Sequence, residues 1–415
     1  MTTAPAAGSL TQASPTGRRY AQLVLVLGAL IALGPLTIDM YLPAFPQISD
    51  ELGASDSAVQ LTLTGMLVGL ATGQLVIGPL SDAFGRRRPL VIGIGMHALA
   101  SLVCAVAPTI GLLATVRVLQ GFSGAAISVV AMAIVRDLFE GVGVARIMSR
   151  LMLVIGLAPI LAPTIGGLVL TFTTWRGIFV VLAGVAVVLV VVAALGIRET
   201  LPPARRRSAT PRSTLTAYRL LLQDRVFVAL AFVGGSMLAA IFAYVSGAPF
   251  VLQDGFGLDE QTFGLVFGLN AVGLTITSQF NPVLLRWFTV LQVLTGAILA
   301  AIAASAMLLV TALSGFGGLV GVLVPLALLV STAGLALPNT PALAMTRHGE
   351  AAGTAAAVLG CVQFGVGAVV APLVGAFGST TAVPMGAVML GVTSFAAVLM
   401  FGVVRRERSP VGSRA

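Results

Sequence analysis

The sequence predicts an all-α integral membrane protein, and three observations support this: its composition, its long apolar runs and the placement of its arginines. Hydrophobic residues make up 58% of the 415 positions and charged residues only 9%, with a mean hydropathy of +1.05. A soluble domain carries about a quarter charged residues, so this chain lacks the polar groups to cover a water-facing surface. We therefore expect the chain to be solvated by a lipid bilayer.

Twelve apolar runs are long enough to cross a bilayer, which takes about 20 residues for each helix. The first run is too long for a cleaved signal peptide and has no small-residue cleavage site after it, so we expect it to stay as the first membrane helix. The expected spans are 20–42, 58–79, 90–107, 111–135, 147–171, 177–197, 226–251, 261–285, 289–313, 318–341, 352–376 and 382–404.

The arginines occupy alternate loops, and this alternation sets the expected orientation. They lie at the amino end, after the even-numbered spans, in the segment 198–225 and in the carboxyl tail. The opposite loops have Arg176 as their one arginine and contain the acids Asp50, Glu51, Asp56, Asp254, Asp259 and Glu260. Cytoplasmic loops carry the excess of basic residues, so we expect both termini in the cytoplasm. The Arg-, Ala- and Gly-rich usage suggests a bacterium, and hence its cytoplasmic (inner) membrane.

The segment 198–225 is the one long polar break, and it divides the spans six and six. A short repeat supports a duplicated unit, since APTIG at 162–166 recurs as APLVG at 371–375. Transporters with two such halves bind their substrate near the midplane between them. The expected organisation is a cytoplasmic tail at 1–19, six-helix bundles at 20–197 and 226–404, a cytoplasmic linker at 198–225 and a second tail at 405–415.

The ionisable residues exclude several classes of chemistry. All 23 basic residues are arginine, so neither a P-loop lysine nor a Schiff-base lysine is available. Two histidines and two separated cysteines form no metal-ligand pattern, so we expect no metal, no cofactor and no enzyme activity. The net charge of +9 is confined to short loops, which argues against nucleic-acid binding. Any driving force must come from an ion gradient, the substrate's own gradient or a partner chain.

A glycine- and arginine-rich stretch, GPLSDAFGRRR, follows the second apolar run at 78–88. Its glycines allow a tight reversal, and an aspartate beside three arginines can form an ion-pair network at the cytoplasmic mouth. A plain topogenic loop is the simpler interpretation. The spacing resembles the signature loop of the major facilitator superfamily, although Ala83 stands where that family usually has Arg or Lys. The resemblance implies a cytoplasmic gate formed by Gly78, Asp82, Gly85, Arg86, Arg87 and Arg88.

Three further stretches of the first half resemble the same superfamily. RVLQGFSG at 117–124 is similar to its second motif, which contains an intramembrane arginine. DMYLPAFP at 39–46 is similar to the end of the first helix in the bicyclomycin and chloramphenicol resistance exporters. The second half matches only in hydropathy and short stretches. The residues that resemble the motif typical of antiporters are Gly156, Pro159, Pro163, Gly166 and Gly167.

The resemblance implies the major facilitator fold of two six-helix bundles. It also implies a multidrug:proton antiporter that exports lipophilic or amphipathic compounds by alternating access. Such a protein confers antibiotic resistance, uses the proton gradient in place of a cofactor, and is expected to act as a monomer. In the second span Gly65, Gly69 and Gly73 recur at four-residue spacing, so we expect them to let another helix approach closely and not to contact substrate. In the fifth span we expect Pro159 and Pro163 to bend the helix.

Two ionisable residues stand out inside the spans. A charge at this depth costs at least about 2.5–3.5 kcal/mol, so Asp39 and Arg117 should face a partner or a water-filled cavity. Asp39 is the candidate proton carrier, Arg117 would adjust its proton affinity, and Gln120 shares a helix face with Arg117. The alternatives are a water-exposed Asp39, a static structural Arg117 and a Gln120 without a role.

Polar side chains elsewhere in the spans are candidates for the substrate cavity, and each is equally a candidate for a helix–helix hydrogen bond. They are Tyr41, Tyr244, Asn270, Asn339 and Gln363. The alternative function of the same fold is a uniporter or an importer of a nutrient or metabolite. Other classes are a membrane-embedded enzyme, a permease subunit that needs an ATPase, and a non-transporting sensor.

Overall fold

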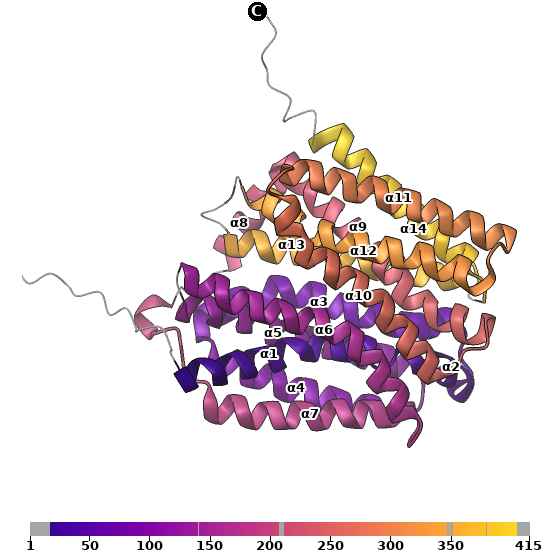
Figure 1. Ribbon diagram of the computed structural model, residues 1–415. Helices are drawn as coiled ribbons and strands as arrows, with labels where there is room; N and C mark the ends of the chain where they lie inside the picture. Colours follow the sequence, from indigo (N-terminus) through magenta and orange to yellow (C-terminus); the bar gives the residue numbers. More distant parts are fainter. Residues whose placement is uncertain are drawn as a thin grey trace, which may run out of the picture.

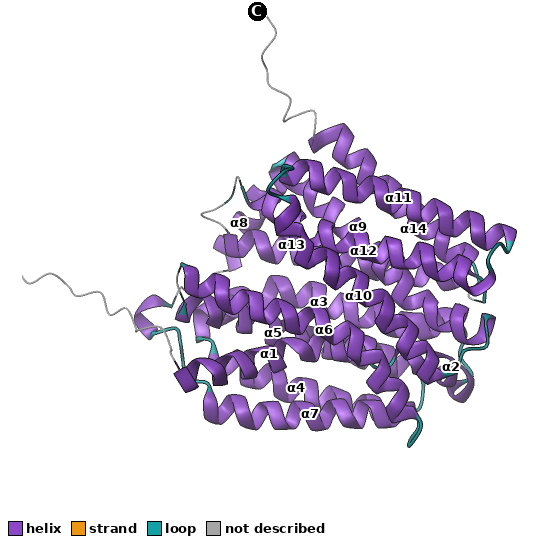
Figure 2. Cartoon of the chain, viewed as in Figure 1, coloured by secondary structure: helices purple, strands orange, loops and turns teal. Residues whose placement is uncertain are grey.

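The computed structural model describes residues 17–139, 141–206, 211–346, 348, 352–378 and 380–404. Helices form all the regular structure in this part of the chain, which contains no strand (Figure 2). Twelve helices are long and apolar enough to cross a membrane, so the predicted all-α membrane fold is confirmed. The predicted tail residues 1–16 and 405–415 lie outside the described residues, as do 207–210 of the linker and Arg347.

The first six spans belong to one half of the molecule, the lower group in Figure 1. Two short helices, η1 (Leu42–Ala44) and α2 (Phe45–Leu52), follow the first span. The spanning helices are α1 (Gly17–Asp39), α3 (Asp56–Phe84), α4 (Arg87–Ala105), α5 (Ile110–Leu138), α6 (Val142–Leu170) and α7 (Trp175–Gly196).

The second half contains the other six spans, drawn as the upper group in Figure 1. Its first span ends in a π-helical turn, η3 (Phe250–Gly255), and its last span in another, η5 (Met400–Val404). The spanning helices are α9 (Arg225–Pro249), α10 (Glu260–Leu284), α11 (Val290–Ser314), α12 (Gly318–Met345), α13 (Ala352–Ala376) and α14 (Ala382–Leu399).

The linker contains helical structure that the sequence analysis did not predict. After the short η2 (Pro203–Arg205), the helix α8 (Pro211–Gln223) precedes the seventh span. Its apolar residues recur every three or four positions, as in an amphipathic helix, and Leu221 on its buried face is 3% exposed. The Tyr218 hydroxyl donates a 2.7 Å hydrogen bond to the Leu75 carbonyl of α3, which fixes α8 against the first half.

The predicted loop at 78–88 is mostly wrong, because α3 continues to Phe84. A helix of 29 residues is about 44 Å long, which exceeds the hydrocarbon thickness of about 30 Å, so α3 is longer than a minimal membrane span. Gly78 therefore lies inside a helix. The reversal needs only Gly85, whose φ of 89° belongs to the left-handed region that favours glycine.

The spans alternate in direction, so each end of the bundle has its own character. One end, here the arginine-rich end, carries Arg18, Arg86–Arg88, Arg150 and Arg225. The other, the acidic end, carries Asp50, Glu51, Asp56, Asp254, Asp259 and Glu260. An even number of spans places both ends of the described chain at the arginine-rich end.

Glycines let α3 and α5 approach closely, as the four-residue spacing in α3 predicts. A Cβ on Gly69 would lie 2.7 Å from the Phe122 nitrogen and would overlap the Val118 carbonyl. On the facing helix, a Cβ on Gly121 would overlap the Met66 carbonyl. Backbones this close gain van der Waals contact that larger residues would prevent. The packing role predicted for this glycine series is therefore confirmed.

The two halves share one apolar core at the acidic end but not at the arginine-rich end. The larger buried cluster joins the first half to the parts of α9, α10 and α13 that lie toward the acidic end, for example through the Phe45 and Phe250 rings at 5.8 Å. A second cluster fills the arginine-rich part of the second half alone, with Leu75 of α3 packed against it. The two halves are therefore joined by a common hydrophobic core at the acidic end and by less apolar packing at the arginine-rich end.

Candidate functional site

Asp39 is the last residue of α1 and lies between the two halves. Asp39 is only 6% exposed and belongs to a membrane span, although an aspartate side chain is charged in water. The chain then turns through Met40 into η1, which contacts α9 and α10 of the second half. A Cβ on Gly166 of α6 would overlap the Met40 carbonyl, so this glycine allows the turn to lie flat against α6.

Within the described residues, the Asp39 carboxylate accepts no hydrogen bond and forms no ion pair. Its electrostatic neighbour is Tyr244 of α9, which belongs to the second half. Most buried carboxylates are hydrogen-bonded or paired, because leaving one without donors is costly. Asp39 is therefore poised at the interface between the halves without a fixed partner among these residues.

Arg117 of α5 is fully buried, and its contacts lie on both sides of Asp39 in the sequence. Its Nη1 donates to the Thr37 carbonyl at 3.1 Å and to Gln120 Oε1 at 2.6 Å. The guanidinium carbon lies 4.2 Å from the centre of the Tyr41 ring. Its Nε and Nη2 are buried and have no hydrogen-bond partner among the described residues. The arginine thus holds the backbone around Asp39 without contacting its carboxylate.

A polar network extends from Arg117 through the first half. Gln120 Nε2 donates to Ser101 Oγ at 2.8 Å, so Gln120 links the Arg117 guanidinium to α4. His97 of α4 is fully buried and is hydrogen-bonded with Thr37 at 3.1 Å and Ser123 at 3.3 Å. The sequence analysis did not place His97 in the site. The sequence could have indicated His97, because it is the one histidine within an expected span.

Four of the five cavity candidates form hydrogen bonds between helices. Tyr41 is paired with Thr62 at 3.0 Å in the first half, and Asn270 Nδ2 donates to the Tyr244 hydroxyl at 3.0 Å in the second. Asn339 Nδ2 donates to Asn281 Oδ1 at 2.6 Å, a partner that the sequence analysis missed. These positions lie at three separate places in the two halves.

Gln363 of α13 differs from the other cavity candidates. It is half-buried, lies beside Gly234 of α9 and has no hydrogen-bond partner among the described residues. Its amide is therefore free to meet a ligand.

At the arginine-rich end, Arg86 is the centre of an ion-pair network. Its side chain is 10% exposed and lies 2.5 Å from Asp82 and 3.0 Å from Asp137 of α5. It also donates to Ser81 Oγ at 2.7 Å. Asp137 was missed from sequence because it lies 51 residues away. Arg87 donates to the Ala194 carbonyl at 2.6 Å, whereas Arg88 is exposed and has no partner in the described part of the chain.

Glu199, at the start of the linker, fastens the same turn through backbone groups. Its carboxylate accepts from the backbone N–H of Arg86 at 2.8 Å and of Leu201 at 3.0 Å. Partial burial raises the pKa of Glu199, but these backbone donors, that of Arg87 and the nearby Arg206 outweigh it, so its pKa lies below the ordinary value.

The described contacts of this ionic network all lie within the first half and the start of the linker. It ties α3 and α4 to α5 and α7. Its predicted role as a gate between the halves stays a prediction.

The antiporter-motif glycines of α6 are points of close approach to two neighbours. Gly166 faces the α1 turn, whereas Gly167 faces α10, where a Cβ would lie 2.6 Å from the Glu260 carbonyl. Gly156 accepts a 3.0 Å hydrogen bond from Thr275 through its carbonyl. Helix α6 runs unbroken through Pro159 and Pro163. These residues therefore shape the interface between the halves.

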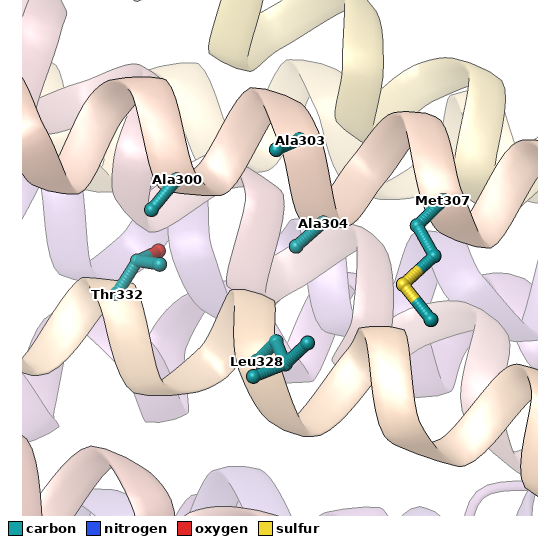
Figure 3. Close-up of a pocket in the computed structure, with 6 residues that line it drawn as sticks. All are labelled: Ala300, Ala303, Ala304, Met307, Leu328 and Thr332. Carbon is teal, nitrogen blue, oxygen red and sulfur yellow. The ribbon is translucent and has the colours of Figure 1, made fainter.

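Two cavities stand out in the described structure, and both lie outside this polar region. One of about 220 Å³ lies between α11 and α12 and is lined by Ala300, Ala303, Ala304, Met307, Leu328 and Thr332 (Figure 3). The other, of about 420 Å³, lies where α8, α9 and α14 meet. The described residues contain no cluster of three or more His, Cys, Asp or Glu that could hold a metal ion.

The chain matches known proteins over most of its length. The family model described as Major Facilitator Superfamily matches residues 25–372. An uncharacterised MFS-type transporter, YdgK of Bacillus subtilis, is 42% identical over 400 residues, which cover 95% of this chain and 98% of that protein. A bicyclomycin resistance protein homologue of Haemophilus influenzae is 32% identical, with 87% and 91% covered. A multidrug resistance protein, MdtL of Klebsiella pneumoniae, is 30% identical, with 63% and 66% covered.

Solved structures agree on the fold. A D-xylose–proton symporter superimposes with a TM-score of 0.73 and 15% identity, covering 93% of this chain and 97% of that one. A bacterial homologue of the lysosomal transporter Spinster, in an inward-facing state, gives a TM-score of 0.73 and 15% identity, with 94% and 98% covered. The twelve spans, the two six-helix halves and the matched sequence together show that this multi-pass membrane transporter belongs to the major facilitator superfamily and groups with its bicyclomycin-resistance-type members.

Proposed function

We propose that the chain is a drug:proton antiporter that exports lipophilic or amphipathic compounds by alternating access. In this proposal it acts as a monomer in a bacterial cytoplasmic membrane, with the arginine-rich end and both termini in the cytoplasm and the proton gradient as its only energy source. Relatives named for bicyclomycin and multidrug resistance support the substrate class. The placement of the arginines supports the orientation.

The observation that carries the proposal is that Asp39 is buried without a hydrogen bond or an ion pair among the described residues. A carboxylate that is 6% exposed, and that has no hydrogen bond or ion pair among the described residues, is stable in this position chiefly when it holds a proton. The turn after Asp39 leads into η1, which touches the second half. Gain or loss of the proton therefore acts at a point where the halves meet.

The surrounding residues have defined parts in this mechanism. Arg117 holds the backbone at Thr37 and the ring of Tyr41, so the segment around Asp39 moves with α5. When the acidic end opens, Asp39 is in contact with the outside solution and takes up a proton from it. When the acidic end closes, the protonated Asp39 is buried, and it later releases its proton toward the cytoplasm. In that state the half-buried amide of Gln363 in α13 is available to a substrate.

The test is drug accumulation in efflux-deficient bacteria that express the wild type or Asp39→Asn, with and without a protonophore. Asp39→Asn keeps the shape but cannot carry a proton, so we expect normal insertion and no uphill efflux. Asp50→Asn is the matched control, because Asp50 is an exposed carboxylate at the same end of the bundle.

Retained uphill efflux in Asp39→Asn would remove Asp39 as the proton carrier. A well-expressed wild type that changes no compound's accumulation would contradict drug export. Purified protein in proteoliposomes then tests proton coupling separately from drug export. Substrate-driven proton movement should be present in the wild type and absent in Asp39→Asn.

A further inference from the structure

The larger cavity is a groove on the side of the second half, at the arginine-rich end. Its volume is about 420 Å³, and its walls come from α9 on one side and from α14 with η5 on the other. Phe232 of α9 and Phe395 of α14 are 38% and 48% exposed, so the groove opens to the outer face of the helices. Beneath it lies the buried cluster that includes Ala396, Met400 and Val404. The groove therefore faces the bilayer and not the interface between the halves.

The chemistry of the groove changes along its length. Of the eight residues that line it, seven are apolar and one, Arg225, is charged. Arg225 is the first residue of α9, at the end of a membrane span, where lipid headgroups lie. An apolar groove with a cationic side chain at the level of the headgroups matches a molecule with a hydrocarbon chain and an anionic headgroup.

Arg225 is available to such a ligand. Its side chain is exposed, and no described residue forms a hydrogen bond or an ion pair with it. The neighbouring Asp224 is engaged elsewhere, since it accepts from the backbone N–H of Val226 at 2.9 Å and lies 2.9 Å from His348 Nε2. Arg219 of α8 is also exposed and adds a second positive charge nearby.

We propose that this groove binds an anionic phospholipid, with one acyl chain between α9 and α14 and the phosphate on Arg225. A guanidinium matches a phosphate with two parallel hydrogen bonds, and basic pockets between spans on the cytoplasmic side suit anionic headgroups. The exposed Leu222 of α8 lines the rim of the groove and would cover the part of the acyl chain nearest the headgroup. Because α8 belongs to the linker, a lipid bound in this groove would contact both the linker and the second half.

The test places a fluorescent reporter in the groove of the full-length protein in nanodiscs. Phe395→Trp is the reporter, Trp287→Phe removes the exposed native tryptophan, and the fully buried Trp175 remains as a constant background. Bromine on the acyl chains quenches tryptophan at short range. We expect brominated phosphatidylglycerol to quench the reporter with roughly a five-fold preference over brominated phosphatidylcholine, as one arginine near anionic lipid provides.

Three variants make the test decisive. Arg225→Gln should abolish the preference, whereas Arg286→Gln, an exposed arginine at the same end, should keep it. Val403→Phe fills the groove from the side of α14 and should lower quenching by both lipids. Equal quenching by the two lipids, a preference that survives in Arg225→Gln, or loss of the preference on adding inorganic phosphate would each overturn the proposal. The last result would assign Arg225 to a free anion.

Discussion

The acidic and arginine-rich ends of the bundle are held together in different ways. At the acidic end the two halves share an apolar core, close backbone contacts and neutral hydrogen bonds. At the arginine-rich end the described ion pairs lie within the first half and the linker or, for Asp224 and His348, between the linker and the second half, and none of them joins the two halves. In the proposed alternating access, contacts between the halves break and re-form, so we expect them to be individually weak. Contacts within a half can be strong, because in that mechanism each half moves as a unit.

Gln60 shows how the acidic end is joined. Its side chain is fully buried; Nε2 donates to the Ser246 carbonyl at 3.1 Å, and Oε1 accepts from the Gly375 nitrogen at 2.8 Å. One residue of α3 thereby bridges α9 and α13. Each such bond contributes about 1 kcal/mol, which is small enough for hydrogen bonds to water to replace it if the two halves separate.

The largest expected effect comes from forcing the acidic end apart. A Cβ on Gly264 of α10 would lie 2.7 Å from the Pro163 carbonyl of α6, and neither backbone can yield without separating the halves. We expect Gly264→Val to disfavour closure by about 3 kcal/mol, on the order of a hundred-fold in population. Spin labels at Thr171 and Thr380, in a background without Cys104 and Cys361, should move apart in pulsed-EPR measurements.

The control for this prediction is Gly95→Val in α4. Nothing in the structure lies within 4 Å of a Cβ on Gly95, so the distance between the labels should not change. An unchanged distance in Gly264→Val would show that α6 and α10 are not the contact that closes this end.

The next effect concerns the ionic network at the other end. Arg86→Gln leaves Asp137, whose side chain is 18% exposed, without its charged partner. We expect a loss of about 2–3 kcal/mol in the free energy of unfolding, lower than for a fully buried pair because Asp82 is half exposed. Thermal unfolding in detergent measures this, and the label distance at the acidic end should stay as in the wild type.

Arg88→Gln is the matched control for Arg86→Gln, since Arg88 is exposed and has no partner among the described residues. Its effect should stay within about 0.5 kcal/mol. A change in the label distance with Arg86→Gln would mean that the ionic network also controls the opposite end, and the contrast between the two ends would fail.

A smaller effect follows from removing the Gln60 bridge. Gln60→Leu keeps the volume but loses both hydrogen bonds between the halves, so we expect closure to weaken by about 1–2 kcal/mol, roughly five- to thirty-fold in population. Gln47→Leu provides the comparison, because Gln47 accepts from the Trp175 nitrogen at 2.8 Å within the first half. It should lower stability without moving the labels. Equal label distances in both variants would contradict the assignment of Gln60 to the acidic-end closure.

The smallest effect is a dependence on pH at the arginine-rich end. The pKa of Glu199 is lower in the folded protein than its ordinary value of 4.5, so its contribution to stability is complete above that value and is lost as pH falls through the lower, folded pKa. The unfolding midpoint of the wild type should therefore fall more between pH 6 and strongly acid solution than that of Glu199→Gln. Parallel pH curves for the two proteins would show that Glu199 does not contribute in this way.

The sequence by itself determined the solvent, the number of spans and the positions of nearly all their ends, because hydrophobic length and arginine placement are local properties of the chain. It also identified Arg117 with Gln120, which are one helical turn apart, and the glycine series of α3. It failed at α8, where an amphipathic helix lies within a polar segment, and at Gly78, because the sequence does not reveal how far a helix extends beyond a minimal membrane span.

Only the tertiary structure decided which of these residues meet. Asp137 and Glu199 reach Arg86 from 51 and 113 residues away, and Gln60 reaches Gly375 across 315 residues. It also separated the Asp39 carboxylate from Arg117, which the sequence analysis paired as proton carrier and modulator, and placed Asp39 near Tyr244 instead. Depth along a helix follows from residue number. The direction in which a side chain points follows from how each helix is rotated against its neighbours, and close packing at glycines such as Gly69 and Gly166 fixes that rotation.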